Sequence, residues 1–143
     1  MALRTVRWAG RMQQVCPEVY FDGAHNTAGI EEFLKTVRQI GGKKPLLLFS
    51  MVKEKDYAAV VRMLSRTDWG GIVVTHIPDA RGLSVAALQE EFEKNGKETV
   101  GINDCRAAYD GVMQKKEPGQ TVFCTGSLYL IGELEKIAGG LKK

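Results

Sequence analysis

Short apolar runs alternate with longer stretches of mixed polarity along nearly the whole chain. These runs are rich in β-branched or aromatic residues and several are apolar throughout, which is typical of parallel strands buried on both faces of a sheet. The expected strands are residues 19–21, 46–49, 72–75, 99–102 and 121–124. The pattern therefore predicts a central sheet whose strands follow one another with long connections.

The stretches between these strands have the spacing of amphipathic helices. Ile30, Phe33, Leu34 and Val37 fall on one face of a helix that we expect over residues 30–40. Similar stripes predict further helices around residues 57–64, 84–92, 104–112 and 127–137. We expect the last helix to end at the glycines of residues 139–140, because glycine commonly terminates helices.

Repeated alternation of strand and helix indicates an α/β fold with a doubly wound, mainly parallel sheet and about five helices. An extra strand is expected over residues 10–15. The turn that follows it, residues 16–18, is too short for a parallel crossover, so this N-terminal strand should pair antiparallel with the next. A length of 143 residues, 44% of them hydrophobic, fits a single domain over residues 1–143.

Charge and composition exclude several classes of protein. The net charge is +3 and the basic residues are scattered, so no nucleic-acid partner is expected. No apolar run approaches the ~20 residues of a membrane helix, and the N-terminus lacks the apolar core of a signal peptide. The three cysteines, Cys16, Cys105 and Cys124, have neither disulfide nor zinc spacing, and we expect Cys16 and Cys124 to be buried thiols. A cytoplasmic protein fits these features.

The most polar cluster lies between the first parallel strand and its helix, at residues 22–26. Ligands of open α/β sheets bind beyond the carboxyl ends of the strands, where helix N-termini also offer N–H donors. Asp22 either caps the helix or accepts hydrogen bonds from a ribose diol. Asn26 is a candidate cap and a candidate ligand contact at once. His25 is a candidate ligand contact, with a structural histidine as the alternative.

Further polar residues follow other strands at the same edge of the sheet. Gly126 would let the backbone approach a ligand, and Ser127 either binds a carboxylate or phosphate or simply caps the last helix. Cations at Lys53, Lys55 and Arg81 would favour an anionic substrate. His76 ends the third strand, and its role stays open. Two histidines without a clear carboxylate spacing give no reason to expect a bound metal.

Glycine-rich nucleotide loops are missing from the sequence. No G-x-x-x-x-G-K-[ST] motif occurs, and no G-x-G-x-x-G motif follows the first strand. The glycines of residues 41–42 follow a helix and are typical of a C-cap. This chain alone should therefore not bind a triphosphate in the manner of a P-loop protein.

Five motifs in register resemble the C-terminal domain of the folylpolyglutamate synthases and bifunctional dihydrofolate/folylpolyglutamate synthases, in the Mur ligase superfamily. Residues 8–12 resemble W-P-G-R-M/F, residues 19–26 resemble the hydrophobic-D-G-A-H-N hallmark, and residues 49–56 resemble F-G-x-x-x-D-K-D. Residues 80–83 resemble the loop after the third strand, and residues 125–130 resemble G-S-L-Y-L. The chain departs from the pattern at Ala9, Gln13, Thr27, Ser50 and Glu54. The Ser50 change, where glycine is usual, bears on the geometry of its loop.

The resemblance implies a Rossmann-like domain of an ATP-dependent amide (C–N) ligase of folate biosynthesis and one-carbon metabolism. ATP phosphorylates the carboxyl group of dihydropteroate or a folyl-glutamate, and the amine of L-glutamate displaces the phosphate to give an amide, ADP and phosphate. The P-loop and the Mg²⁺ ligands of the family belong to an N-terminal ATPase domain of the same polypeptide. We therefore expect this chain to be a fragment that is inactive alone, with ATP and Mg²⁺ bound mainly by the missing domain.

The resemblance also implies roles for individual residues. Asp22, Asn26 and Arg11 would contact the nucleotide, with Arg11 serving the hinge between domains as the alternative. His25 would be catalytic, and Ser127, Lys55 and Arg81 would bind the substrate. Two other readings stay open: another ligase of the superfamily, of the muramoyl peptide or cyanophycin type, or a non-catalytic α/β binding domain.

Overall fold

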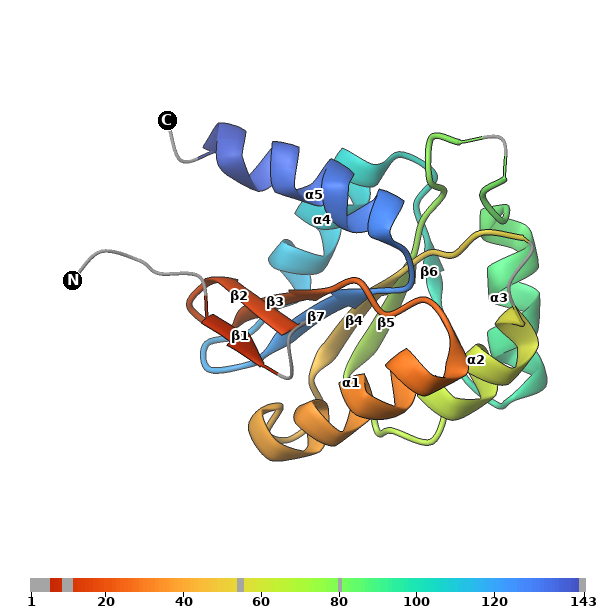
Figure 1. The fold of residues 1–143 in the computed structure, drawn as a ribbon, viewed down its shortest axis with the longest axis horizontal. Helices are drawn as coiled ribbons and strands as arrows, with labels where there is room; N and C mark the ends of the chain where they lie inside the picture. Colours follow the sequence, from red (N-terminus) through yellow and green to blue (C-terminus); the bar gives the residue numbers. More distant parts are fainter. Residues whose placement is uncertain (1–5, 9–11, 54–55, 80, 142–143) are drawn as a thin grey trace.

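Strands and helices alternate along residues 6–8, 12–53, 56–79 and 81–141, which a computed structural model describes (Figure 1). The strands are β1 (Val6–Trp8), β2 (Met12–Cys16), β3 (Val19–Asp22), β4 (Leu46–Phe49), β5 (Gly71–Val74), β6 (Val100–Gly101) and β7 (Val122–Thr125). The helices are α1 (Thr27–Ile40), α2 (Tyr57–Leu64), α3 (Val85–Lys94), α4 (Cys105–Lys115) and α5 (Leu128–Leu141). The strands form one sheet in the order β1-β2-β3-β7-β4-β5-β6. This arrangement confirms the predicted fold class.

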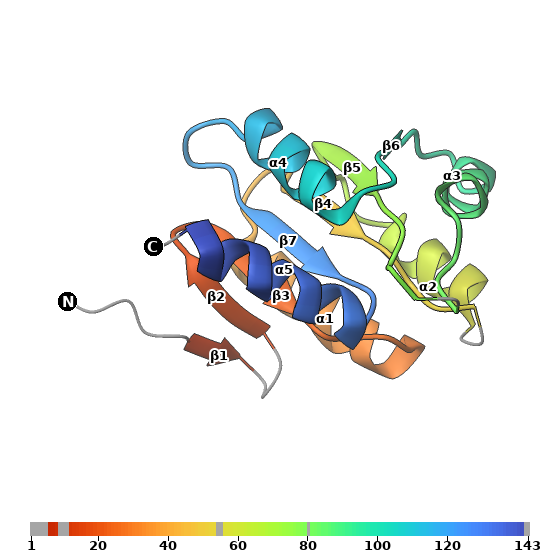
Figure 2. The ribbon, with the colours of Figure 1, turned by 90° about the horizontal axis from the view of Figure 1, so that it is seen from above.

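Helices cover both faces of the sheet, which explains why its central strands are apolar throughout (Figures 1 and 2). In β4, Leu47 and Phe49 pack in the cluster formed with α1, α2 and α3, whereas Leu46 and Leu48 pack in the cluster formed with α4 and α5. Phe123 of β7 anchors the first cluster, with its ring centroid 5.7 Å from that of Phe33. Every residue of β4 is buried as a result.

The N-terminal strands form an antiparallel extension of the sheet. The predicted strand is present as β2, and it pairs antiparallel with β3 across a tight turn, as expected. The sequence patterns did not indicate β1, which pairs antiparallel with β2. Glu18 in the turn has a φ of 69°. The remaining strands, from β3 to β6, are parallel.

Three expectations need correction. The strand expected over residues 99–102 is reduced to β6, which has two residues, both exposed at the edge of the sheet. The last helix does not end at residues 139–140, because α5 continues through these glycines to Leu141. Cys124 is fully buried, and burial raises the pKa of its thiol, but Cys16 is only partly buried. In the described part of the chain, no helix combines the length and the apolarity that crossing a bilayer requires.

Candidate functional site

The carboxyl ends of four parallel strands lie in one row across the sheet. Asp22 pairs with Thr125, Thr125 with Phe49, and Phe49 with Val74. Each strand leads into a loop. We use the name carboxyl edge for these loops (residues 23–26, 50–53, 75–83 and 126–127, apart from residue 80) together with Asp22 at the end of β3 and Leu128 and Tyr129 at the start of α5. The candidate site residues of the described part follow these strands, so the topology gathers them at this edge, as the sequence predicts.

Asp22 organises the turn that follows β3. Its side chain is 2% exposed, and its Oδ1 accepts a hydrogen bond of 2.8 Å from the backbone N–H of Ala24. The N-cap of α1 is Asn26 and not Asp22, so that alternative is wrong. A contact between this carboxylate and a ribose stays a prediction.

His25 and Asn26 occupy the residues just before α1. The Nδ1 of His25 lies 2.9 Å from the carbonyl oxygen of Gly23, and since a carbonyl can only accept, Nδ1 carries the proton in this contact. In the neutral ring, Nε2 is then the acceptor. Asn26 is the N-cap, because its Oδ1 accepts from the N–H of Gly29 at 2.8 Å. The half-buried imidazole thus uses Nδ1 within its own turn, which leaves Nε2 for a ligand at the carboxyl edge.

Gly126 joins three loops of the carboxyl edge. Its N–H donates to the carbonyl of Ala24 at 3.1 Å, and its φ is 122°. A Cβ at this position would lie 1.9 Å from the carbonyl oxygen of Ser50 and 2.7 Å from the ring of Phe49. Here the glycine permits the close approach of another loop, which is a different reason from the ligand contact that we expected.

Ser127 caps α5, which was one of the two alternatives predicted for it from the sequence. Its Oγ accepts a hydrogen bond of 3.0 Å from the N–H of Tyr129, and the residue is 2% exposed. By contrast, the buried Oγ of Ser50 has no hydrogen-bond partner within the described ranges. The substrate-binding role of Ser127 stays a prediction.

Arg81 ties the loop after β5 to the start of α5. Its backbone N–H and its Nε donate to Oδ1 of Asp79 at 2.8 and 3.3 Å. These two hydrogen bonds lower the pKa of the Asp79 carboxyl. The guanidinium also donates to the hydroxyl of Tyr129 and lies over its ring, 4.9 Å from the centroid. Half of the Arg81 side chain stays exposed, so the cation lies at the surface of the carboxyl edge.

The loop after β4 is bound to the loop after β5. The N–H of Lys53 donates to the carbonyl of Arg81 at 2.7 Å, and the N–H of Leu83 donates to the carbonyl of Met51 at 2.9 Å. Val52 and Gly82 form an antiparallel bridge between these two pairs. The carboxyl edge is therefore a connected surface rather than a set of independent loops.

Several candidates lie elsewhere or stay open. Arg11 and Lys55 are outside the described residues. The Nδ1 of His76 lies 3.2 Å from the carbonyl of Leu83, within its own loop. Among the residues with described positions, no group of three or more His, Cys, Asp or Glu side chains could hold a metal ion.

The sequence patterns missed Leu128 and Tyr129 as parts of this edge. Leu128 is 64% exposed and Tyr129 50% exposed, and Leu128 lies so close to Gly23 that a Cβ there would come within 2.5 Å of it. The sequence contained an indication of this, because both residues lie at a strand-to-helix junction and outside the apolar face predicted for the last helix. Two adjacent large side chains with this much exposure form an apolar patch, and such patches can mark an interaction site.

Comparisons with known proteins agree on a family. The family model of the "Mur ligase, glutamate ligase domain" matches residues 10–128. A dihydrofolate synthase/folylpolyglutamate synthase from Bacillus subtilis is 30% identical over 132 residues, which is 90% of this chain and 30% of that protein. A folylpolyglutamate synthase from Lacticaseibacillus casei is 24% identical over 148 residues, which is 96% of this chain and 32% of that protein. The chain thus spans about a third of these relatives' length.

Solved structures show the same fold. A Mycobacterium tuberculosis folylpolyglutamate synthase complexed with ADP has a TM-score of 0.77 and 25% identity, over 88% of this chain and 31% of that one. E. coli FolC in complex with DHPP and ADP has a TM-score of 0.81 and 19% identity, over 91% of this chain and 31% of that one.

Proposed function

Since this chain belongs to the Mur ligase family as a glutamate ligase domain, we propose that it serves an ATP-dependent ligase that adds L-glutamate to dihydropteroate or folyl-(poly)glutamate. The contact between two loops of the carboxyl edge supports this proposal most directly. The loop with Asp22 and His25 is joined to the loop with Ser127 by the 3.1 Å hydrogen bond from Gly126 to Ala24. Two motifs about a hundred residues apart thereby lie side by side at the end of the sheet.

The chemistry of this surface suits a substrate with carboxylates and an amine. L-Glutamate must reach an acyl phosphate with its amine deprotonated and its carboxylates held. Arg81 supplies an exposed cation for a carboxylate or phosphate, with Lys55 as a second. The acceptor nitrogen of His25 can receive an N–H of the incoming amine. The N-terminus of α5, where Ser127 lies, favours negative charge.

ATP and a divalent metal belong to the proposal, but mostly outside this chain. The sequence has no P-loop motif, and the described part has no metal-binding cluster, so phosphates and Mg²⁺ would be held by another domain. The matching structures include a Yersinia pestis enzyme complexed with AMPPNP and a Mn ion. In our proposal, Asp22, Asn26 and Arg11 contact the nucleoside portion of ATP, or Arg11 serves the hinge.

The natural partner in this proposal is an N-terminal ATPase domain of the same polypeptide, in the cytoplasm. Closing the carboxyl edge over that domain would exclude water from the acyl phosphate, which hydrolysis would otherwise destroy. The exposed side chains of Leu128 and Tyr129 lie at this edge and suit such a contact.

The test is ligase activity of the protein at its full natural length. We expect ADP release that requires both L-glutamate and either dihydropteroate or a folate, and no ligase activity from the 143-residue chain alone. ADP release that depends on a muramoyl peptide instead would assign the chain to another ligase of the superfamily. Robust ADP formation by the 143-residue chain would contradict the proposed division of labour between domains.

A further inference from the structure

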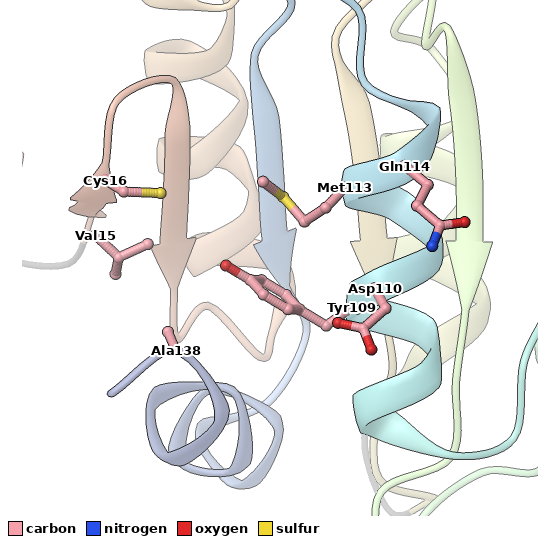
Figure 3. Close-up of a pocket in the computed structure, with 7 residues that line it drawn as sticks. All are labelled: Val15, Cys16, Tyr109, Asp110, Met113, Gln114 and Ala138. Carbon is pink, nitrogen blue, oxygen red and sulfur yellow. The ribbon is translucent and has the colours of Figure 1, made fainter. Parts of the chain in front are cut away.

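A cavity of about 450 Å³ lies away from the carboxyl edge, between β2, α4 and α5 (Figure 3). Val15 and Cys16 of β2 line one side and Ala138 of α5 another. Tyr109, Asp110, Met113 and Gln114 of α4 complete it. This volume falls in the range of small-molecule sites, about 300–1,000 Å³, and the lining is mostly apolar.

The cavity is at the opposite end of the sheet from the ligase residues. Cys16 pairs with Val19 at the start of β3, whereas Asp22 lies at the end of that strand. Ala138 lies ten residues after Leu128 in α5, which corresponds to about 15 Å along a helix. The cavity is therefore separate from the carboxyl edge and is not explained by the proposed ligase function.

Tyr109 gives this cavity a polar group for which the described residues provide no hydrogen-bond partner. The residue is 4% exposed, and its ring makes an edge contact with Phe21 at a centroid distance of 6.2 Å. Figure 3 shows the hydroxyl pointing from α4 across the cavity toward β2 and β3. Among the described residues, none forms a hydrogen bond with it. This oxygen is not one of the fully buried oxygens without a partner in the described residues, which are those of Ser50 and Thr99, so it is accessible from the cavity and can donate to a ligand carbonyl there.

The other residues that line the cavity restrict the kind of ligand that can bind. Met113 and the thiol of Cys16 provide polarizable sulfur beside the phenol ring, which favours aromatic groups. Asp110 places an exposed carboxylate at the opening and disfavours anions. Burial and the neighbouring acidic groups raise the pKa of Tyr109 to about 12, so its hydroxyl stays a donor at physiological pH.

We propose that the cavity between β2, α4 and α5 binds a small neutral aromatic molecule whose carbonyl group accepts a hydrogen bond from the Tyr109 hydroxyl. Such a ligand would not contact the residues of the carboxyl edge, because the cavity lies at the other end of β3 and of α5. The site would allow a molecule to bind this domain without competing at the carboxyl edge.

The test uses a pair of probes, 2-acetylnaphthalene and its counterpart without a carbonyl, 2-ethylnaphthalene. Binding to the ¹⁵N-labelled 143-residue chain is followed through the amide NMR signals of Cys16, Asp110 and Met113. We expect saturable shifts of these signals with the ketone. Tyr109→Phe should weaken the ketone about five-fold, the effect of one neutral hydrogen bond, and change the affinity of the hydrocarbon less than two-fold.

Two further variants keep the test decisive. Tyr57→Phe removes a tyrosine hydroxyl on the other face of the sheet and should leave both affinities unchanged. Ala138→Trp should fill the cavity and weaken both probes. The proposal is overturned if the ketone causes no saturable shift at the three amides in the unmodified chain. It is also overturned if Tyr109→Phe weakens both probes equally or neither.

Discussion

The two loops that flank β7 differ in how they use the same kind of residue. Each contains a glycine with positive φ, Gly119 at 83° before the strand and Gly126 at 122° after it. Around Gly119 there is open space, and its loop is held by exposed hydrogen bonds such as that from Glu117 N–H to Gln120. Around Gly126 there is another loop in contact. Gly119 therefore serves only to form a turn, whereas Gly126 allows three loops to come into contact.

This difference shows that the loops after the strands are packed more closely than the loop before β7. Buried polar residues gather at the carboxyl edge, where Asp22, Ser50 and Ser127 are each 2% exposed or less. The side-chain oxygens of Asp22 and Ser127 accept backbone hydrogen bonds, which offsets the cost of burying them and fixes this end of the sheet by specific contacts. We expect mutations there to be more damaging than matched mutations in the loop before β7.

The largest effect is expected at Gly126, with Gly119 as the matched control. Gly126→Ala introduces a Cβ that cannot avoid the Ser50 carbonyl, in addition to an unfavourable φ, so we expect a loss of about 3 kcal/mol or more. Gly119→Ala suffers only from φ and should cost about 1 kcal/mol. Urea unfolding of both variants measures the difference. Equal losses would show that the contact with Ser50 does not constrain the edge.

An intermediate effect is expected at Asp22. Asp22→Ala removes the acceptor of the buried 2.8 Å bond from Ala24 and should lower the free energy of unfolding by about 2 kcal/mol. Asp22→Asn keeps an acceptor oxygen and should lose less than half of that. If thermal unfolding shows the two variants to be equally damaged, the carboxylate charge rather than the turn hydrogen bond is what stabilises this loop.

The smallest changes in the free energy of unfolding are expected for the two buried serines, and they should differ from each other. Ser127→Ala removes an N-cap and should cost about 1 kcal/mol. Ser50→Ala removes a buried hydroxyl for which the described residues provide no partner, so it should be neutral or stabilising by less than about 1 kcal/mol. Denaturant midpoints of the two variants should move in different directions or by clearly different amounts. A similar loss for both would indicate that Ser50 has a hydrogen-bonding role.

Much of the fold was predictable because burial on both faces leaves a clear trace in the sequence. The apolar run of β4 and the helical stripe of α1 are local patterns, and both appear as expected. The expected strand over residues 99–102 failed for a tertiary reason. Gly101 lies against α3, where a Cβ would come within 2.4 Å of Val85, and only two residues pair with β5 at the sheet edge.

The candidate site was predictable in position but not in its internal contacts. Strand ends followed by polar residues locate the carboxyl edge, and Asn26 was identified as a possible cap from its place before a helix. The partnership of Arg81 with Tyr129 joins residues 48 positions apart, and the Ser50–Gly126 contact joins residues from different loops. Such contacts depend on the order of the strands, which local patterns do not specify.

We propose that the carboxyl edge binds L-glutamate. Steady-state kinetics of the protein at its full natural length test it most directly, with His25→Ala and Ser127→Ala compared with Arg66→Ala, an exposed cation at the other end of α2. We expect the two edge variants to raise the KM for L-glutamate about ten-fold or more, beyond any change in the KM for ATP, while Arg66→Ala keeps the KM of the unmodified protein. Unchanged glutamate kinetics in both edge variants would contradict it.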